Sequence, residues 1–444
     1  MIRDWTDLCA NPRCDTIPAS NSSFISGFIR PGLMNIPRTD LSEFANEIGS
    51  EWRDDIAPFW LRLAPDEAHG GFRGVVNNDL TIDEKAEKGI ILNSRILWTF
   101  SRAYHLFKDD AYLHMANRAF TYIVDHFFDR VDGGVFWTVD YNGQPLDMKK
   151  RTYAQAFALY GFTEYYSATG VDDSLSRAFD LYSLIETRCR DIDNDGYLET
   201  FDRDWTLAAD QRLSEVDQDD KKSMNAHLHV LEAYTSLARA TRDVRVLDRL
   251  RGVLQLFVDK IVHPDRTHLQ MFFEEQWKST SMIRSFGHDI EASWLLCEAA
   301  KVLGSPEISR RTQEVALVIA DSVYAMGLDD NGALLYEADP DGIVNREKHW
   351  WVQAEAVVGF INAWRLTDES RYFVAARRVW DFIRANMIDR VYGEWYWKTS
   401  DAGLPSEEMP KLSQWKCPYH NGRMCFEVRE RLMNREENSW NGAY

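Results

Sequence analysis

Long stretches of the chain place apolar residues at positions i, i+3, i+4 and i+7, which is the spacing of an amphipathic helix. Examples are "NSRILWTFSRAYHLF" (93–107), "AQAFALYGFTEYYSAT" (154–169), "NAHLHVLEAYTSLARAT" (225–241) and "AEAVVGFINAWRLT" (354–367). The short segments between such stretches contain an acidic turn and then an alternating aromatic or apolar run, which predicts a turn that enters a short strand. The chain is therefore expected to alternate between long helices and short turn–strand segments.

The turn–strand segments recur with a regular period. Their marking glycines are Gly71, Gly134, Gly196, Gly332 and Gly393, which are spaced by roughly 60 residues apart from one double gap. The segment "HPDRTHLQMFFEEQW" (263–277) lies inside the double gap and has the same shape without the glycine. Six units with two helices each give about twelve helices.

Six stacked helical hairpins can close into a ring. We therefore predict an all-α fold, an (α/α)6 barrel of about twelve helices with short β-hairpins and loops at one rim. An open solenoid is the alternative, but it would need capping repeats that the sequence does not show. The Pro-, Asn- and Ser-rich N-terminus fits no unit, so we expect residues 1–38 to be a weakly structured extension and residues 39–435 to form a single barrel domain.

Composition limits the possible partners. The 444-residue chain has a formal net charge of −19, which argues against nucleic acid as a partner. No window approaches the roughly 20 apolar residues of a membrane span, and the N-terminus lacks a secretion signal. We expect a cytoplasmic protein that is a monomer or a weak homodimer, with its six cysteines reduced. Sixteen tryptophans suit stacking on sugar faces, although they suit a helical core equally well.

Several polar residues lie within the apolar helical stretches. Asn225 and His229 are four residues apart and share a helix face, whereas His227 points elsewhere. His288 and Glu291 are three residues apart and share another face. A single histidine on an apolar helix is more often a hydrogen-bonded core residue, but histidines in separate units raise the expectation of catalysis.

Two further positions complete the set of candidates. His420 follows the sixth turn–strand segment, and Arg95 is the only charge in "GIILNSRILWTF", where a buried guanidinium needs a partner or an anionic ligand. No H-E-x-x-H motif is present, so we predict no metal at these histidines. The stretch "DIDNDGYLETFD" (191–202) matches the EF-hand calcium pattern, but it is also the third copy of the repeated acidic turn, which favours a structural role.

Four stretches carry a resemblance to a known family. "KKSMNAHLHVLEAY", "SFGHDIEASWLLCEAA", "WWVQAEAVVGFINAW" and "WKCPYHNGRMCFEV" closely resemble the cellobiose 2-epimerases of the N-acylglucosamine 2-epimerase superfamily, and the likeness runs from about residue 40 to about residue 430. The resemblance implies the same barrel and a reversible epimerisation at C2 of a reducing-end glucose or mannose, as in cellobiose or a related β-1,4-disaccharide, without a cofactor. The site residues that it implies, with Tyr153 added as a substrate-binding residue, are Arg95, Tyr153, Asn225, His229, His288, Glu291, Trp351, Trp415 and His420.

The chemistry of C2 inversion suggests a role for each residue. The sugar ring must open, the C2 proton must leave, and a proton must return to the opposite face of a planar enediolate, so a base that is neutral near pH 7 is required. We expect His288 and His420 to be the acid/base pair at C2 and His229 to move protons during ring opening. Arg95 would stabilise the enediolate oxygen, and Glu291 would orient His288 or bind a sugar hydroxyl.

The expected binding residues are Asn225, Tyr153 and two stacking tryptophans, Trp351 and Trp415. Other functions remain open at this point. A mannose/glucose 2-epimerase or an aldose–ketose isomerase of the same superfamily is the nearest alternative. An inverting glycoside hydrolase would need two carboxylates roughly 6.5–9.5 Å apart. A non-catalytic sugar-binding protein would need the aromatic residues but not the three histidines.

Overall fold

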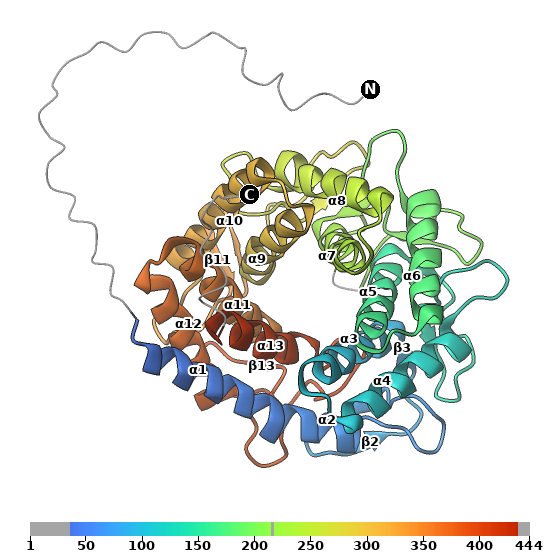
Figure 1. Ribbon diagram of the computed structural model, residues 1–444, viewed down its shortest axis with the longest axis horizontal. Helices are drawn as coiled ribbons and strands as arrows, with labels where there is room; N and C mark the ends of the chain where they lie inside the picture. Colours follow the sequence, from blue (N-terminus) through green and yellow to red (C-terminus); the bar gives the residue numbers. More distant parts are fainter. Residues whose placement is uncertain (1–35, 215–216, 434–444) are drawn as a thin grey trace, which may run out of the picture. The chain divides into compact units, whose positions relative to one another are not determined.

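The computed structural model describes residues 36–214 and 217–433. Within this part of the chain, the helices form an inner and an outer ring around one axis (Figure 1). The inner helices are α3 (Ile90–Phe107), α5 (Thr152–Thr169), α7 (Met224–Thr241), α9 (Phe286–Leu303), α11 (Trp350–Thr367) and α13 (Tyr419–Met433). The outer helices are α1 (Arg38–Glu51), which continues through the π-helical η2 (Trp52–Ile56) into α2 (Ala57–Leu63), and α4 (Asp110–Tyr122), α6 (Asp172–Leu184), α8 (Val244–Leu256), α10 (Pro306–Met326) and α12 (Ser370–Phe382).

The inner ring is closed. Each inner helix packs against the next one, α13 packs against α3, and α1 covers α13 from outside. With α1, η2 and α2 counted as one, the described residues contain the twelve helices of an (α/α)6 barrel, so the predicted fold is confirmed.

Burial explains which helices lie inside. In α11 the residues from Val352 to Ile361 are all buried, because an inner helix is covered on every side. In α8 only one stripe is buried, which includes Val246, Leu250 and Val253. The spacing of these residues is the one that the sequence pattern predicts for a helix with one apolar face.

The two ends of the barrel differ. Inner helix α5 ends at Gly170, whose φ of 74° is left-handed, and outer helix α6 begins two residues later at Asp172. The same short connection follows α3, α7, α9 and α11. The longer turn–strand segments all lead from an outer helix back to the N-terminus of an inner helix, so they gather at the opposite end, which we call the rim.

Most outer helices approach the rim through a π-helical turn. These turns are η3 (Ile123–Phe127), η4 (Ile185–Cys189), η5 (Phe257–Ile261) and η6 (Ile383–Met387). Each is followed by a turn–strand segment. The widened turn thus marks the point where the chain leaves the outer ring.

The rim strands are very short. They are β1 (Val75–Val76), β2 (Ile82–Asp83), β3 (Lys88–Gly89), β4 (Thr138–Val139), β5 (Lys150–Arg151), β6 (Thr200–Phe201), β7 (Lys222–Ser223), β8 (Phe272–Phe273), β9 (Arg284–Ser285), β10 (Glu337–Asp339), β11 (Gly342–Asn345), β12 (Lys348–His349) and β13 (Lys398–Thr399).

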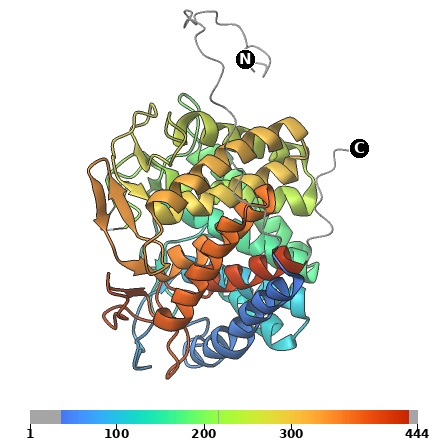
Figure 2. The same cartoon turned by 90° about the vertical axis from the view of Figure 1, so that its left-hand side faces the viewer.

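The pairing of these strands refines the predicted hairpins. Strands β1–β2 and β10–β11 pair within one unit, and Figure 2 shows the β10–β11 pair in orange beside the helices. The other pairs join consecutive units, as where β3, just before α3, pairs antiparallel with β4 of the next unit. The short strand that precedes an inner helix thus forms its hydrogen bonds with a strand of the neighbouring unit.

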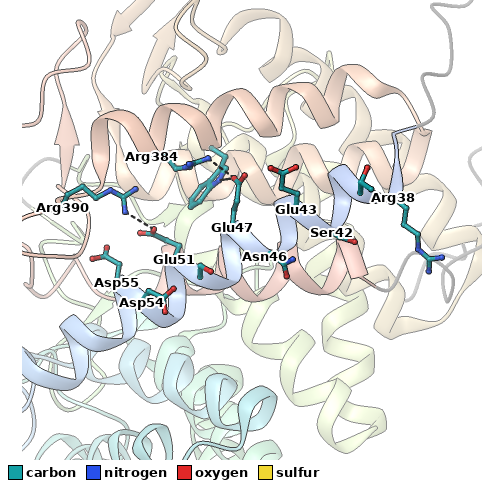
Figure 3. A pocket seen from close by; sticks show the side chains of 13 residues that line it. Arg38, Ser42, Glu43, Asn46, Glu47, Glu51, Asp54, Asp55, Arg384 and Arg390 are labelled. Carbon is teal, nitrogen blue, oxygen red and sulfur yellow. Dashed lines mark hydrogen bonds and ion pairs between the residues drawn. The ribbon is translucent and has the colours of Figure 1, made fainter.

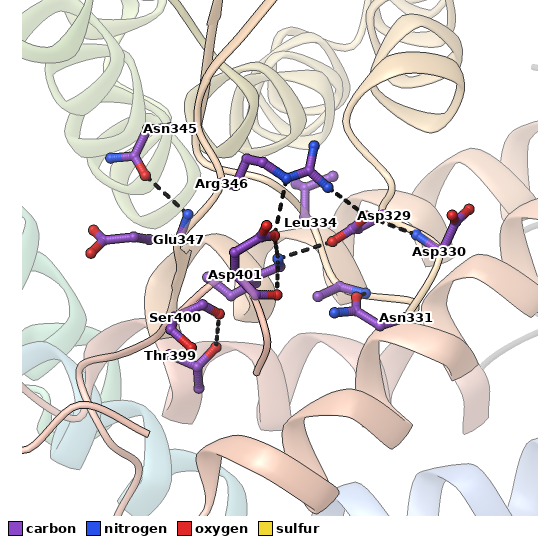
Figure 4. A network of polar contacts seen from close by, with 12 residues as sticks. Asp329, Asp330, Asn331, Leu334, Asn345, Arg346, Glu347, Thr399, Ser400 and Asp401 are labelled. Carbon is purple, nitrogen blue, oxygen red and sulfur yellow. Dashed lines mark hydrogen bonds and ion pairs between the residues drawn. The ribbon is translucent and has the colours of Figure 1, made fainter. Parts of the chain in front are cut away.

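A buried ion pair recurs at the rim. The aspartate that opens a turn–strand segment binds the lysine that precedes the inner helix, as in Asp129–Lys150 at 3.0 Å and Asp191–Lys222 at 2.8 Å. The fifth unit has the same pair in Asp329–Lys348, joined by Asp401 and Arg346 (Figure 4). The carboxylate of Asp191 is therefore engaged by an ammonium group, as expected for a structural turn.

The fourth unit keeps the geometry with different residues. The backbone N–H of His263 donates to the carbonyl oxygen of His268, as Asp129 does to Gly134, which identifies residues 263–277 as the missing repeat. Its cation is Arg284, and the partner carboxylate is Asp289 on α9, at 2.7 Å. The fourth unit thus also has a buried charge pair before its inner helix, but the acid lies on that helix and not in the turn.

Other predictions from the sequence concern the whole chain. Four cysteines, Cys189, Cys297, Cys417 and Cys425, are free thiols in the described part of the protein. None of the described helices has the length and apolar character needed to cross a membrane. Nearly all of the predicted 1–38 extension lies outside the described residues, so it stays a prediction together with the 39–435 domain boundary.

Candidate active site

The predicted site residues lie at the rim ends of the inner helices. Tyr153, Asn225, His288, Trp351 and His420 all fall within the first three residues of α5, α7, α9, α11 and α13 respectively. Arg95, His229 and Glu291 lie one turn deeper on α3, α7 and α9. Because six helix N-termini point toward this region, its backbone favours negative charge in a bound ligand.

The Trp351 ring contacts both His288 and His420. The ring centroid of Trp351 lies 4.8 Å from that of His288 and 5.7 Å from that of His420. His229 packs against Tyr153 with ring centroids 5.0 Å apart, and the Tyr153 ring lies 6.2 Å from Trp415. The three histidines and three aromatic residues predicted from separate units thus form one cluster.

Two of the histidines are held by glutamates. Nδ1 of His229 lies 3.0 Å from a carboxylate oxygen of Glu232, and Nδ1 of His420 lies 2.7 Å from one of Glu355. A carboxylate accepts a hydrogen bond from a protonated Nδ1, which leaves Nε2 as the nitrogen free to act as a base. The Trp294 indole N–H also donates to Glu355, at 3.1 Å.

A single arginine joins the glutamates. The guanidinium of Arg423, on α13, binds Glu355 at 2.6 Å and also contacts Glu232 and Glu291. All four side chains are buried. We call these four residues the rim cluster.

Glu291 and His288 have different partners. One expectation from the sequence was that Glu291 orients His288. In the structure Nδ1 of His288 lies 2.9 Å from the hydroxyl of Ser285, and Glu291 binds Arg423. Ser285 is the N-cap of α9, so its hydroxyl already lies beside the first turn. The role of Glu291 as a sugar ligand stays a prediction.

Arg95 lacks an acidic partner. Its guanidinium donates to the Tyr153 hydroxyl at 2.8 Å and the Trp415 carbonyl at 3.4 Å, and it lies over the Phe157 ring at 4.3 Å. Among the described residues no carboxylate forms an ion pair with it, although Arg95 is only 4% exposed. The site therefore contains a buried cation whose charge is available to an anionic ligand.

Asn225 and His288 share a small cavity of about 40 Å³, which Glu199 and Ser223 also line. The side-chain oxygen of Asn225 is buried and has no hydrogen-bond partner among the residues that the structure describes. Burial raises the pKa of Glu199 to about 8, although its carboxylate accepts a hydrogen bond from the backbone N–H of Ser223. Glu199 thus lines the same cavity as His288 and has a raised pKa, which the sequence did not reveal.

Burial also sets the protonation of the central groups. It lowers the pKa of His288 to about 3, with the charge of His229 as a second cause. The pKa of His420 falls well below its ordinary value through burial and the charges of Arg95 and Arg423. Burial and the neighbouring Glu355 raise the pKa of Glu291 to about 7. Both histidines are therefore neutral near pH 7, as a base at C2 requires.

Two cavities differ in their relation to the histidines. A rim cavity of about 610 Å³ is lined by Trp137, Trp397, Trp415 and Arg151 among others, and it borders the cluster through Trp415. A larger hollow of about 1090 Å³ lies along α1 and α12 and is lined by charged residues such as Glu47, Asp54 and Arg390 (Figure 3). None of the predicted site residues lines the larger hollow, whereas Trp415 lines the rim cavity and Asn225 and His288 line the small one.

The comparison with known protein families shows which family the chain belongs to. Residues 70–420 match the model of the family described as N-acylglucosamine 2-epimerase. The chain belongs to this family. The chain is 43% identical to the cellobiose 2-epimerase of Bacteroides fragilis, over 86% of this chain and 97% of that protein.

Solved structures agree with this membership of the N-acylglucosamine 2-epimerase family. The cellobiose 2-epimerase of Bacillus thermoamylovorans B4167 superposes with a TM-score of 0.84 at 40% identity, over 88% of this chain and all of that one. A D-mannose isomerase superposes with a TM-score of 0.77 at 22% identity, over 89% of this chain, which shows a shared fold alone. The chain is a sugar 2-epimerase, an isomerase of this family.

The sequence missed part of the site. Glu232, Glu355 and Arg423 lie within the stretches that carry the family resemblance, and Glu232 and Arg423 each follow a predicted histidine by three residues. The available signal was a charged residue on the same face of an otherwise apolar helix. His227 was correctly placed outside the site, since its ring accepts the backbone N–H of Tyr197.

Proposed function

We propose that this 2-epimerase interconverts the glucose and mannose configurations at C2 of the reducing-end residue of cellobiose or a related β-1,4-disaccharide. The observation that carries the proposal is the pair of neutral histidines that both contact Trp351, together with a buried arginine that has no carboxylate partner among the described residues. The rim cavity of about 610 Å³ supports a disaccharide, because three tryptophans line it and one of them, Trp415, lies beside Tyr153.

His288 and His420 act at C2 in the proposed mechanism. One removes the C2 proton of the open-chain aldose, and the other returns a proton to the opposite face of the planar enediolate. His229 moves the proton between O1 and O5 during ring opening and closure. The contact with Glu355 orients the ring of His420 through Nδ1, and Glu232 does the same for His229.

Arg95 stabilises the negative charge that develops on the enediolate oxygen. Its guanidinium is already fixed by Tyr153 and by the Trp415 carbonyl, so it needs little reorganisation when the charge appears. The N-termini of the inner helices act in the same direction. Trp351 and Trp415 stack on the sugar rings, and Asn225 and Glu291 bind hydroxyl groups. These steps are proton transfers and need no cofactor.

Two other functions predict different products. Protonation of the same enediolate at C1 would give a ketose, as in an aldose–ketose isomerase. An inverting hydrolase would use a carboxylic acid and a carboxylate across a glycosidic bond. Glu291 and Glu355 are instead bound to Arg423, which argues against that use.

A substrate panel tests the proposal. The purified protein is incubated separately with cellobiose, mannose and glucose, and the products are identified by NMR. We expect 4-O-β-glucosylmannose from cellobiose at a higher kcat/KM than any product from the monosaccharides. A faster reaction with mannose would make the protein a monosaccharide epimerase, fructose or its disaccharide counterpart as main product would make it an isomerase, and released glucose would make it a hydrolase.

We further propose that the protein acts in the cytoplasm as a monomer or a weak homodimer. Its free thiols support a reducing compartment. Light scattering on the eluting protein across a range of concentrations measures the oligomeric state, and a tight dimer or larger assembly would contradict this part.

A further inference from the structure

Arg423 has no place in the proton transfers described above, yet it contacts every carboxylate of the rim cluster. It is fully buried at the second turn of α13, and its three partners come from three other inner helices, α7, α9 and α11. Its guanidinium also lies over the rings of Trp294 and Tyr419, at 4.8 and 4.4 Å. The Tyr419 hydroxyl donates a hydrogen bond to Glu232, so α13 supplies a second partner for this carboxylate.

Stability alone does not explain such a cluster. Removing four charged groups from water is costly, and a well-packed set of apolar side chains is often at least as stable as a buried ion network. The cluster has a net charge of −2 if its three carboxylates are ionised and Arg423 is charged, so it is also electrostatically unbalanced. A functional reason must lie in what the carboxylates hold.

Two of the three carboxylates each hold one histidine. Glu232 contacts Nδ1 of His229 on α7, and Glu355 contacts Nδ1 of His420 on α13. A protonated carboxyl group can donate a hydrogen bond to Nδ1 instead of accepting one, and the histidine beside it then carries its own proton on Nε2. The charge state and position of Glu232 and Glu355 therefore decide which ring nitrogen of each histidine carries the proton.

We propose that Arg423 is a positioning residue for both histidines at once: by binding Glu232 and Glu355 with one rigid guanidinium, it fixes His229 and His420 together in the form protonated on Nδ1. The inference rests on the proposed function, because it assumes that these histidines exchange protons with the sugar. At Glu355 burial raises the pKa and Arg423 opposes that rise, whereas at Glu232 burial is outweighed by Arg423, His229 and Tyr419 together, and the pKa is lowered. Arg423 thus favours the ionised form of both carboxylates, which accepts hydrogen bonds.

The planar fork of the side chain is essential to this role. Two nitrogens of one guanidinium bind the two carboxylates, Nη1 toward Glu232 and Nη2 toward Glu355. A lysine ammonium at the same place is a point charge on a flexible stem and cannot hold both in a fixed geometry. The proposal therefore distinguishes arginine from lysine, whereas a simple need for positive charge does not.

The test begins with the wild-type protein. Long-range 1H–15N correlation spectra of protein labelled with 15N-histidine report which ring nitrogen carries the proton. We expect His229 and His420 both to carry it on Nδ1 at neutral pH. A proton on Nε2 in either one overturns the proposal, and this measurement needs no substrate.

Substitution then separates positioning from structure. Arg423→Met should lower kcat by about 10–100-fold, the loss typical of residues that orient a reacting group, with KM little changed. The tautomers of both histidines should become mixed. The matched control is Arg431→Met, which removes a second buried arginine from α13 that binds Glu298 and Glu427 and no histidine. It should leave kcat and the tautomers unchanged.

Equal losses of kcat in the two variants, or unchanged tautomers in Arg423→Met, would overturn the proposal. If Arg423→Met does not fold, Arg423→Lys replaces it. It should still lower kcat and mix the tautomers, and wild-type kcat in this variant would overturn the proposal too. If the wild-type protein epimerises none of the three sugars, the proposed function fails, whereas the tautomer spectra still decide the role of Arg423.

Discussion

Two clusters of arginine and glutamate lie at opposite ends of the inner helices. The rim cluster has one arginine for three glutamates. The other, which we call the base cluster, contains Arg102, Arg239 and Arg431 with Glu298, Glu427 and Glu430. A cavity of about 560 Å³ at this end is lined by further cations, including Arg242, Lys301 and Arg365.

The opposite charge balance follows from the direction of the helices. All inner helices begin at the rim, where their unpaired N–H groups favour carboxylates, and end at the base, where their unpaired C=O groups favour cations. Base cations therefore compensate the helix ends and need no ligand. At the rim the same helices favour negative charge, so a developing enediolate beside Arg95 is stabilised by the scaffold itself.

The largest expected effect concerns the rim histidines. His288→Ala and His420→Ala should each lower kcat by about 10²–10⁴-fold while the protein stays folded, because each removes an acid/base group at C2. The matched control is His114→Ala, which replaces an exposed histidine on the outer helix α4. Steady-state kinetics with cellobiose measure the effect, and near-normal turnover in either rim variant would refute the assignment.

A smaller loss is expected at Arg95. Arg95→Lys keeps the positive charge but loses the planar fork that contacts Tyr153 and the Trp415 carbonyl, so kcat should fall by about 10-fold or more. Circular dichroism checks that the fold is intact. An unchanged kcat would make Arg95 a structural residue and remove the link between rim charge and catalysis.

The base cluster should affect stability alone. Arg431→Met removes the arginine that binds Glu427 and one of the two that bind Glu298, so it should lower the free energy of unfolding by about 1–3 kcal/mol. Denaturant unfolding measures this loss. Without denaturant, where both proteins are folded, the kcat of the variant should match that of the wild type. A catalytic defect in this variant would show that the two ends of the barrel are not independent.

The last effect, which appears only at acidic pH, is the pH dependence of stability at His288. Its pKa falls from an ordinary value of 6.5 to about 3 on folding, so the unfolded chain binds more protons between these values. This group therefore contributes its full stability above pH 6.5 and loses it progressively as the pH falls toward 3. The Tm of His288→Gln should decline less than that of the wild type over this window, and parallel curves would contradict the shift.

The fold was largely predictable because it is periodic. Equally spaced acidic turns and apolar helices such as the one at 354–367 fix the number of units, and inner helices need apolar residues on every side. Strand pairing between units was not predictable, because two-residue strands such as β3 and β4 carry no pattern of their own. The exchange of an Asp–Lys pair for Arg284–Asp289 in the fourth unit also becomes visible only when the side chains are placed.

The site was predictable where a polar residue interrupts an apolar helix. His229, His288 and Arg95 were predicted in this way, and the structure places all three at the rim ends of the inner helices, where their roles stay a prediction. The rim cluster was not found, because Glu232, Glu291 and Glu355 come from three units and meet only through Arg423. Which glutamate supports which histidine is a property of the ring and not of any single stretch of sequence.

The central claim is that C2 is inverted by proton transfer through rim histidines that exchange with water. The most direct test is the reaction of cellobiose in deuterated water, with deuterium at C2 of the product measured by NMR or mass spectrometry. The account predicts deuterium at C2 of the epimer and, in ordinary water, loss of label from C2-deuterated substrate with a primary isotope effect. An epimer that keeps its original hydrogen at C2 in both experiments would contradict the account.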